Sequence, residues 1–145
     1  MSKQVEETKT TTISLPKQYD EEEIQHIILT PEEKHIIDAL ADDSAILIGA
    51  DAQNRSARFL LDTAVSIAGR HPDADVFLDD VTVSRKHAKF IRNEDGFILQ
   101  DCNSLNGTYV NTDRIDEYKL KDGEEIRIGK FRFVFYSANY DPYHS

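Results

Sequence analysis

From Ser44 onward the apolar residues come in short runs that turn-forming residues separate. The runs cover 45–48, 58–61, 64–67, 75–78, 87–91, 97–100, 108–110, 125–128 and 131–136. Gly, Asp and Asn dominate the gaps between them, as in Gly69 and Gly129. Many short strands at roughly even spacing are typical of an antiparallel β-sandwich. In the last run Phe131, Phe133 and Phe135 alternate, so we expect them to share the face that points into the core.

The chain before residue 44 has a different pattern. Residues 1–19 are polar and carry few large apolar side chains, which predicts disorder. Further on, apolar residues recur at helical spacing: Ile24, Ile27 and Ile28, then Ile36, Ile37 and Leu40. Between the two groups, Thr30-Pro31-Glu32-Glu33 has the residues of a capping box with Pro at the first helical position. Short helices are marginal alone, so this one either docks on the domain or frays.

Charge marks the same boundary. The 145 residues carry a formal net charge of −10. Residues 1–43 hold four lysines and eleven carboxylates, which gives −7, and the remainder is nearly balanced at −3. We therefore predict an acidic, flexible and partly helical tail over 1–43, a folded domain over 44–137 and a C-terminal tail over 138–145.

Composition excludes several classes of protein. A net charge of −10 argues against a general nucleic-acid binder, which needs a basic face. No run approaches the ~18 apolar residues of a membrane span, and the first residues do not form a secretion signal. The single cysteine, Cys102, cannot form an internal disulfide, which fits a reducing cytoplasm.

Three segments in predicted loops carry the chemistry of anion binding. They are Gly69-Arg70, Ser84-Arg85-Lys86-His87 and Asn106-Gly107. Arg supplies a forked cation, Ser a hydroxyl donor, and Asn both a donor and an acceptor. Each segment alone has a simpler interpretation: a solvated Arg after a turn, or a hairpin turn at Asn106-Gly107. Together they predict loops that converge on a phosphate.

Catalysis is the weaker interpretation of Ser84 and His87. This possible nucleophile and base are three positions apart, but no G-x-S-x-G turn and no third member accompany them. The chain also has no glycine-rich nucleotide loop and no metal-ligand motif. We expect no enzyme activity, no metal and no cofactor. We expect His87 to begin a strand and point inward.

The ordered set resembles the forkhead-associated (FHA) domain over about residues 44–137. This resemblance implies an all-β fold, an eleven-stranded antiparallel β-sandwich of the SMAD/FHA type, and recognition of phosphothreonine peptides by loops at one end. By position, Arg70 and Ser84 bind phosphate, Arg85 adds charge, and Asn106 holds the peptide backbone. Gly69, His87 and Gly107 shape the loops. Thr82 and Leu105 contact the phosphate or the residues that follow it.

A narrower resemblance is to bacterial FHA regulators of 2-oxoglutarate and glutamate metabolism. It rests on four segments: 69–72, 77–85, 104–111 and 128–132. Such regulators are phosphorylated near the N-terminus by Ser/Thr kinases. Here Thr10 or Thr11 fits the acceptor, although Lys9 replaces an acidic residue and Ser14 an aromatic one.

The resulting hypothesis is a cytoplasmic, monomeric switch. Phosphorylation at Thr10 or Thr11 would fold the tail onto its own phosphate site. The unphosphorylated form would bind metabolic enzymes such as 2-oxoglutarate dehydrogenase. The alternative is a plain phosphopeptide adaptor that docks on kinases or other phosphoproteins and has no tail switch.

Overall fold

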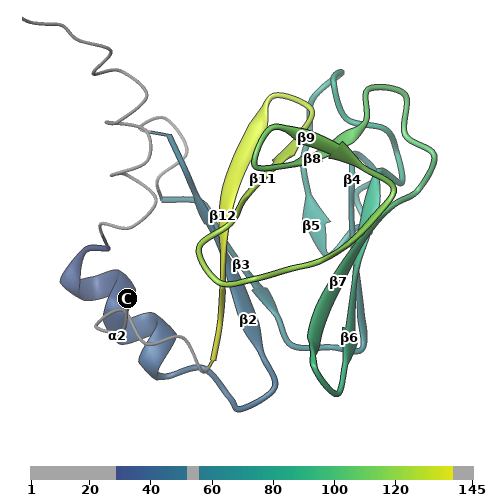
Figure 1. Ribbon diagram of the computed structural model, residues 1–145. Helices are drawn as coiled ribbons and strands as arrows, with labels where there is room; N and C mark the ends of the chain where they lie inside the picture. Colours follow the sequence, from purple (N-terminus) through teal and green to yellow (C-terminus); the bar gives the residue numbers. More distant parts are fainter. Residues whose placement is uncertain (1–28, 52–55, 139–145) are drawn as a thin grey trace, which may run out of the picture.

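Two β-sheets face each other and enclose the core of the domain (Figure 1). The computed structural model describes residues 29–51 and 56–138. The predicted disorder over 1–19, the acceptors Thr10 and Thr11, the first isoleucine group and residues 139–145 lie outside these ranges. The described residues form eleven strands, so the prediction of an eleven-stranded sandwich is confirmed.

Each sheet has a defined strand order. The five-stranded sheet runs β10 (Glu117–Lys119), β7 (Gly96–Asp101), β6 (Ala88–Asn93), β4 (Val65–Gly69) and β5 (Val76–Phe77). The six-stranded sheet runs β3 (Arg58–Leu61), β2 (Ala45–Gly49), β12 (Phe131–Ser137), β11 (Glu125–Ile128), β8 (Thr108–Val110) and β9 (Asp113–Ile115). Neighbouring strands are antiparallel, except that β5 pairs with β4 in parallel. Hydrogen bonds from Leu78 N–H to Gly69 O (2.9 Å) and from Ile67 N–H to Asp75 Oδ2 (2.9 Å) hold the chain beside β4 in that direction.

The core lies between the sheets and follows the predicted alternation. Phe133 and Phe135 are buried, and Phe131 packs against them. Phe135 meets Phe97 of the opposite sheet edge to face, with ring centroids 5.7 Å apart. The apolar runs therefore placed the buried face of β12 correctly.

Two strands have no counterpart among the predicted runs. β9 (Asp-Arg-Ile) and β10 (Glu-Tyr-Lys) are three residues long, and four of their six residues are charged. Each pairs along one side with a neighbour that is already in the sheet. Backbone pairing with that neighbour, rather than apolar alternation, therefore places them.

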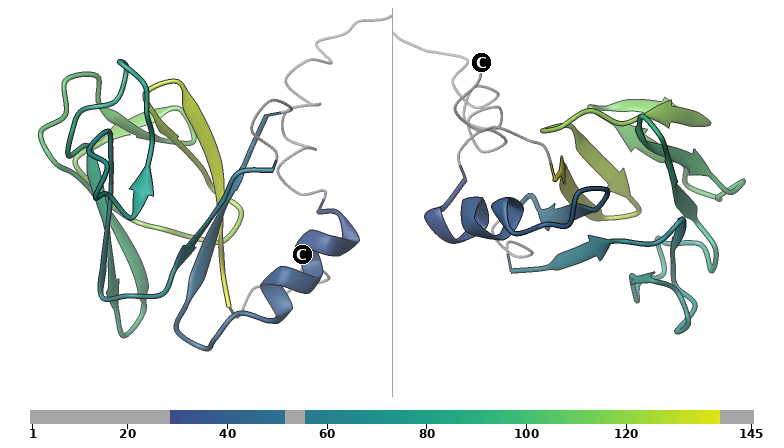
Figure 2. Two further views of the ribbon diagram at one scale, coloured as in Figure 1. Left: turned by 180° about the vertical axis from the view of Figure 1, so that it is seen from behind. Right: turned by 90° about the horizontal axis from the view of Figure 1, so that it is seen from below.

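Helix α2 (Pro31–Asp38) begins at the predicted capping box. Thr30 Oγ1 accepts from Glu33 N–H and Glu33 Oε1 accepts from Thr30 N–H, both at 3.0 Å. The helix docks instead of fraying: Leu29 and Ile37 are buried in a second apolar cluster. The partners in that cluster are Ile46, Ile48, Ala50, Val134 and Tyr136 on the outer face of β2 and β12. Figure 2 shows α2 lying against this sheet.

Docking of α2 extends the folded part of the chain toward the N-terminus. Leu29, the first described residue, is already buried in this cluster, 15 positions ahead of Ser44 where the pattern of short strands starts. Within the described residues, no helix has both the length and the apolar character needed to cross a membrane.

Candidate functional site

Three loops and one turn meet at one end of the sandwich. The loops follow β4, precede β6 and precede β8, and the turn at Gly129-Lys130 joins β11 to β12. Hydrogen bonds between them define the arrangement: Leu105 N–H to Ser84 Oγ (3.1 Å), Asn106 Nδ2 to Thr82 O (2.9 Å) and Lys130 N–H to Thr82 Oγ1 (3.0 Å). Residues from 21 to 48 positions apart in the sequence thus share one site.

Arg70 is fixed at its base and open at its tip. Its backbone N–H donates to Ser84 O (3.0 Å), and its Nε donates to Val83 O (3.0 Å). These two bonds orient an otherwise exposed side chain across the start of the second loop. The two terminal guanidinium nitrogens therefore remain for an anion, in the fork geometry that suits phosphate oxygens.

Gly69 allows the first two loops to approach closely. A Cβ at this position would lie 2.0 Å from the carbonyl oxygen of Arg85, which is backbone and cannot swing aside. Any other residue would therefore push Arg85 and its loop away from Arg70. The exposed Arg85 thus owes its place beside the site to the missing side chain at Gly69.

His87 joins two loops from inside the protein. Its ring is fully buried, one residue before β6. Nδ1 accepts from Ser84 N–H (3.1 Å), so Nε2 carries the proton and donates to Gly107 O (2.8 Å). The single ring therefore fixes the spacing between the Ser84 loop and the Asn106-Gly107 loop.

The same contacts remove the geometry of a hydrolytic pair. Both ring nitrogens of His87 are bonded to backbone groups, and neither reaches the Ser84 hydroxyl. Ser84 Oγ instead accepts from Leu105 N–H, which leaves its hydroxyl hydrogen to donate outward. This arrangement suits binding of an anion, and it means that His87 does not serve as a general base for Ser84.

Thr82 is the centre of a hydrogen-bond network that the sequence did not indicate. Its hydroxyl donates to Asp80 Oδ2 (2.6 Å), and its backbone N–H donates to the same oxygen (2.9 Å). Lys130 Nζ lies 3.1 Å from Asp80 Oδ1. The bonds from Thr82, together with Lys130, lower the pKa of Asp80 to about 2. Asp80 is therefore a carboxylate at neutral pH and ties Thr82 to the Gly129-Lys130 turn.

Gly129 is a second glycine that the site requires. Its φ is +59°, and a Cβ there would lie 2.5 Å from Thr82 Oγ1. The only signal in the sequence was its place in the turn between two strands. Its contact with Thr82 depends on tertiary structure.

A buried network beneath Asn106 also escaped the sequence analysis. Asp101 accepts from Ser104 Oγ (2.6 Å), Ser104 N–H (3.0 Å) and Thr108 Oγ1 (2.7 Å), and Ser104 Oγ accepts from Gly107 N–H (2.9 Å). Burial alone would raise the pKa of Asp101, but these donors outweigh it and lower that pKa. The only local signal was Asp101 three residues before Ser104, a spacing common in turns. The network holds Asn106 at the rim of the site.

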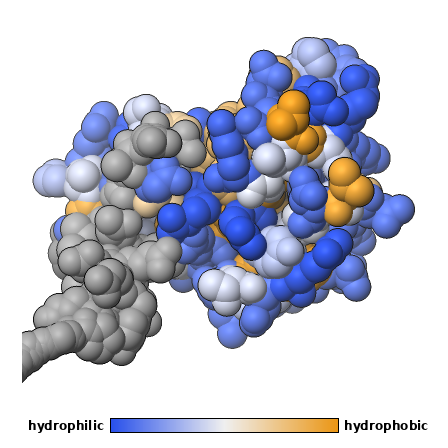
Figure 3. Space-filling view, turned by 90° about the horizontal axis from the view of Figure 1, so that it is seen from above, coloured by the Kyte–Doolittle hydropathy of each residue, from blue (hydrophilic) through white to orange (hydrophobic). Residues whose placement is uncertain are grey.

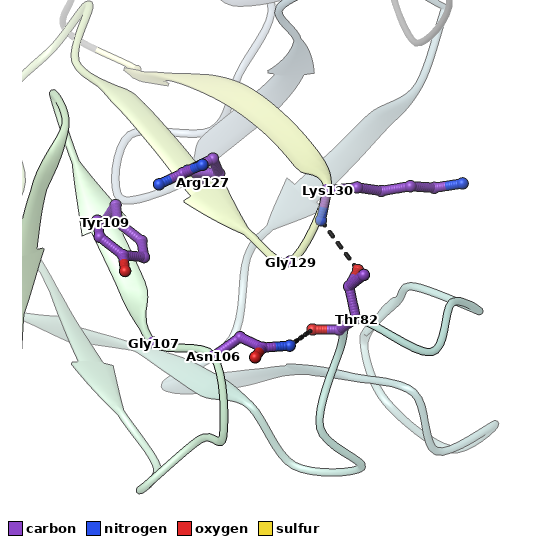
Figure 4. A pocket seen from close by; sticks show the side chains of 7 residues that line it. All are labelled: Thr82, Asn106, Gly107, Tyr109, Arg127, Gly129 and Lys130. Atoms are coloured by element: carbon purple, nitrogen blue, oxygen red, sulfur yellow. Dashed lines mark hydrogen bonds between the residues drawn. The ribbon is translucent and has the colours of Figure 1, made fainter.

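A cavity of about 350 Å³ opens beside Asn106 (Figure 4). Its walls are Thr82, Asn106, Gly107, Tyr109, Arg127, Gly129 and Lys130. The guanidinium carbon of Arg127 lies 4.3 Å from the centre of the Tyr109 ring. Two cationic residues, Arg127 and Lys130, therefore line this cavity together with Asn106.

The rim of the site carries two exposed apolar side chains. Leu105, predicted to contact the ligand, is 86% exposed, and Val81, which the sequence analysis missed, is 87% exposed. Figure 3 views this end and shows a mostly hydrophilic surface with separate hydrophobic residues. Among the described residues, no group of three His, Cys, Asp or Glu side chains could hold a metal ion.

Comparisons with known proteins agree with this geometry. Residues 67–129 match the FHA domain family. An oxoglutarate dehydrogenase inhibitor of Corynebacterium jeikeium is 50% identical over 71% of this chain and 72% of its own length. The glycogen accumulation regulator GarA of Mycobacterium tuberculosis is 52% identical over 68% of this chain, which spans 61% of that relative. A solved structure from work on phosphothreonine-dependent FHA domain interactions is 34% identical, with a TM-score of 0.59 over 64% of this chain and 95% of that one.

Proposed function

Because this chain belongs to the FHA domain family, we propose that it is a phosphothreonine-binding regulator and that its ligand site is the loop end built around Arg70 and Ser84. The observation that supports this most directly is the convergence of these two side chains, with Arg85 and Asn106, on one open surface. Arg70 points two free nitrogens outward, and Ser84 has one hydroxyl hydrogen to donate. A phosphate dianion accepts both.

The remaining residues take supporting parts in this proposal. Arg85 adds positive charge, and Asn106 uses its free Oδ1 to accept a backbone N–H of the bound peptide. Thr82 and the exposed Leu105 contact the peptide beyond the phosphate. Gly69, His87 and Gly107 hold the loops at the required spacing, through the close approach and the two ring bonds described above.

The regulated enzyme is of the 2-oxoglutarate dehydrogenase type. The relative from C. jeikeium is an oxoglutarate dehydrogenase inhibitor, and GarA is a glycogen accumulation regulator. Their names describe regulators and not enzymes, which agrees with the finding that His87 does not serve as a general base for Ser84. We infer that this chain acts in the same way, in the cytoplasm and as a monomer. It binds phosphothreonine proteins, including the Ser/Thr kinase that modifies it.

Self-inhibition follows if Thr10 or Thr11 is phosphorylated. Thr11 lies 18 positions before Leu29, where the chain is anchored. A flexible segment of that length has a root-mean-square span of about 23 Å. Its effective concentration is on the order of a millimolar. A tail of micromolar intrinsic affinity would then be closed about a thousand to one.

Calorimetric titration with a phosphothreonine peptide tests the site. We expect binding by the wild type, none with the unmodified peptide, and a loss of roughly 2–5 kcal/mol in Arg70→Ala. Equal affinity of Arg70→Ala and wild type would refute the assignment.

An inhibition assay with 2-oxoglutarate dehydrogenase tests the regulatory part. The unphosphorylated protein should inhibit, and the kinase-treated protein should not. Binding of phosphopeptides without any change of enzyme inhibition on phosphorylation would favour the adaptor interpretation.

A further inference from the structure

The outer face of the six-stranded sheet has an apolar half and a cationic half. Helix α2 covers the apolar half, which includes Ile48 and its cross-strand partner Val134. On the other half, Arg127 of β11 stands opposite Tyr109 of β8, and Tyr109 stands opposite Arg114 of β9. Directly paired residues project on the same face of a sheet. We call these three residues the arginine row.

The register places the arginine row on the same face as α2. Glu125 stands opposite Val134, which lies under the helix. Arg127 is two residues further along β11, so it points to the same side as Glu125. The row is therefore part of the surface on which α2 lies and is not covered by the helix, because both arginines are exposed.

The two arginines of the row have no acidic partner among the described residues. The Arg127 guanidinium lies over the Tyr109 ring, and the Arg114 side chain lies beside Gly107. Within 29–51 and 56–138, neither arginine forms an ion pair, whereas the adjacent Arg132 is bound to Glu125. Figure 4 shows Arg127 and Tyr109 together at the border of the cavity. The row is thus an exposed cationic strip that begins next to the phosphate site.

The described chain joins the same surface at Leu29, on its apolar half. Arg58 stands opposite Ile48 and lies 3.6 Å from Glu32 Oε2 and 3.9 Å from Glu33 Oε2. These contacts place the first turn of α2 at the β3 side of the sheet, whereas Leu29 packs in the apolar cluster with Ile48 and Val134. From Val134 on β12, the arginine row lies one step along the strands, about 7 Å, and one to three strand spacings away, about 5–15 Å.

We propose that the arginine row binds the acidic run Asp20–Glu23 of this same chain. The run has four consecutive carboxylates and ends six residues before Leu29. Six residues span at most about 20 Å, which is enough for the distance just given. Arg and carboxylate groups form charge-assisted, often bidentate hydrogen bonds, and the two arginines flank Tyr109 at the spacing of neighbouring strands.

This contact forms without phosphorylation. It holds the tail over β8 and β11, between the anchor at Leu29 and the loops around Asn106. As a further consequence, which rests on the proposed function, phosphorylated Thr10 or Thr11 starts near the phosphate site and closes on it more readily.

NMR spectroscopy of the unphosphorylated full chain tests the contact, because no phosphate takes part. The wild type is compared with D20N/E21Q/E22Q/E23Q at about 20 mM salt. We expect the backbone and Nε–H signals of Arg114 and Arg127 to differ between the two proteins. Raising the salt to about 0.5 M should move the wild-type signals toward those of the variant, because exposed charges are then screened within a few ångströms.

The reverse variant supplies the matched control. R114Q/R127Q should shift the tail signals of residues 20–23. K119Q/K121Q, which removes two exposed cations around the end of edge strand β10 of the other sheet, should leave them in place. The two double variants change the net charge equally.

Two results would overturn the proposal. One is identical Arg114 and Arg127 signals in the wild type and the neutralised tail. The other is tail signals that do not respond to R114Q/R127Q. If R114Q/R127Q then weakens binding of the regulated enzyme, the arginine row serves an acidic partner and not the tail. Failure of phosphothreonine recognition is measured separately, by the Arg70→Ala titration, so the two failures are distinguishable.

Discussion

Replacement of His87 by Ala should weaken folding and ligand binding together. The ring is fully buried and makes two hydrogen bonds, one to each of two loops. Its removal leaves Gly107 O without that donor inside the protein, which costs about 1–3 kcal/mol. The lost bond to Ser84 N–H and the cavity left by the ring add about 1–2 kcal/mol. We therefore expect a destabilisation of roughly 2–5 kcal/mol.

The effect on melting is large enough to measure. For a folded unit of about 100 residues, 1 kcal/mol shifts Tm by about 4 °C or more, so His87→Ala should lower Tm by at least ~8 °C. Differential scanning calorimetry gives Tm, and titration at a temperature where the variant is still folded gives phosphopeptide affinity. His71→Ala is the control, because His71 belongs to the same end of the molecule but its side chain is 42% exposed.

The outcome separates two roles for His87. A structural role predicts a lower Tm together with weaker binding, since the loops lose their common brace. If His87→Ala keeps the wild-type Tm and loses only phosphopeptide affinity, the ring belongs to the ligand contacts and the reasoning above is wrong.

Three further predictions concern other parts of the fold. Gly69→Ala should destabilise the domain in urea and weaken phosphopeptide binding, because its Cβ would meet the Arg85 carbonyl at 2.0 Å; unchanged stability would contradict the close approach. Asp80→Asn should be less stable than wild type at pH 7. The depressed pKa of Asp80 contributes stability that is complete above its ordinary value of 3.8 and lost as the pH falls to about 2. The difference between the two proteins should therefore shrink across that window in acid denaturation, and a difference as large at pH 2 as at pH 7 would refute this origin. Ile37→Ala should cost about 2–4 kcal/mol, since the side chain is 1% exposed. It should speed hydrogen exchange in α2 while phosphopeptide affinity at the loops stays the same.

The sequence predicted those elements of the fold that short-range patterns of residues determine. The alternation of apolar residues located the core face of β12, and the capping box located the start of α2. β9 and β10 could not be found in this way because their charged residues pair through the backbone with neighbours that only the fold supplies.

The residues of the site divide in the same way, into those that the sequence indicated and those whose role depends on the fold. Arg70, Ser84 and Asn106 stood out because their side chains have the chemistry of anion binding. Asp80 and Gly129 did not, because their importance comes from contacts with Lys130 and Thr82 across as many as 50 residues. Such contacts leave no periodicity or spacing in the sequence.

The sequence contains a second signal for the docking of α2, in addition to the capping box. The run 45–48 is continuously apolar rather than alternating, and β2 is buried along its whole length. A strand that is apolar on both faces needs cover on both faces. Leu47 faces the core between the sheets, while Ile46 and Ile48 face α2.

The docking of α2 on the outer face of β2 and β12 shortens the segment between Thr11 and the folded domain. A tail that became free at position 44 would place 33 residues between Thr11 and its anchor, but the anchor at Leu29 leaves 18. Effective concentration falls roughly as the −3/2 power of tether length, so the shorter tether raises it about 2.5-fold. Undocking α2 should therefore weaken self-inhibition without touching the phosphate site. The apolar run in β2 thus affects the strength of the proposed switch, because it holds α2 against the sheet and so sets the length of the tether.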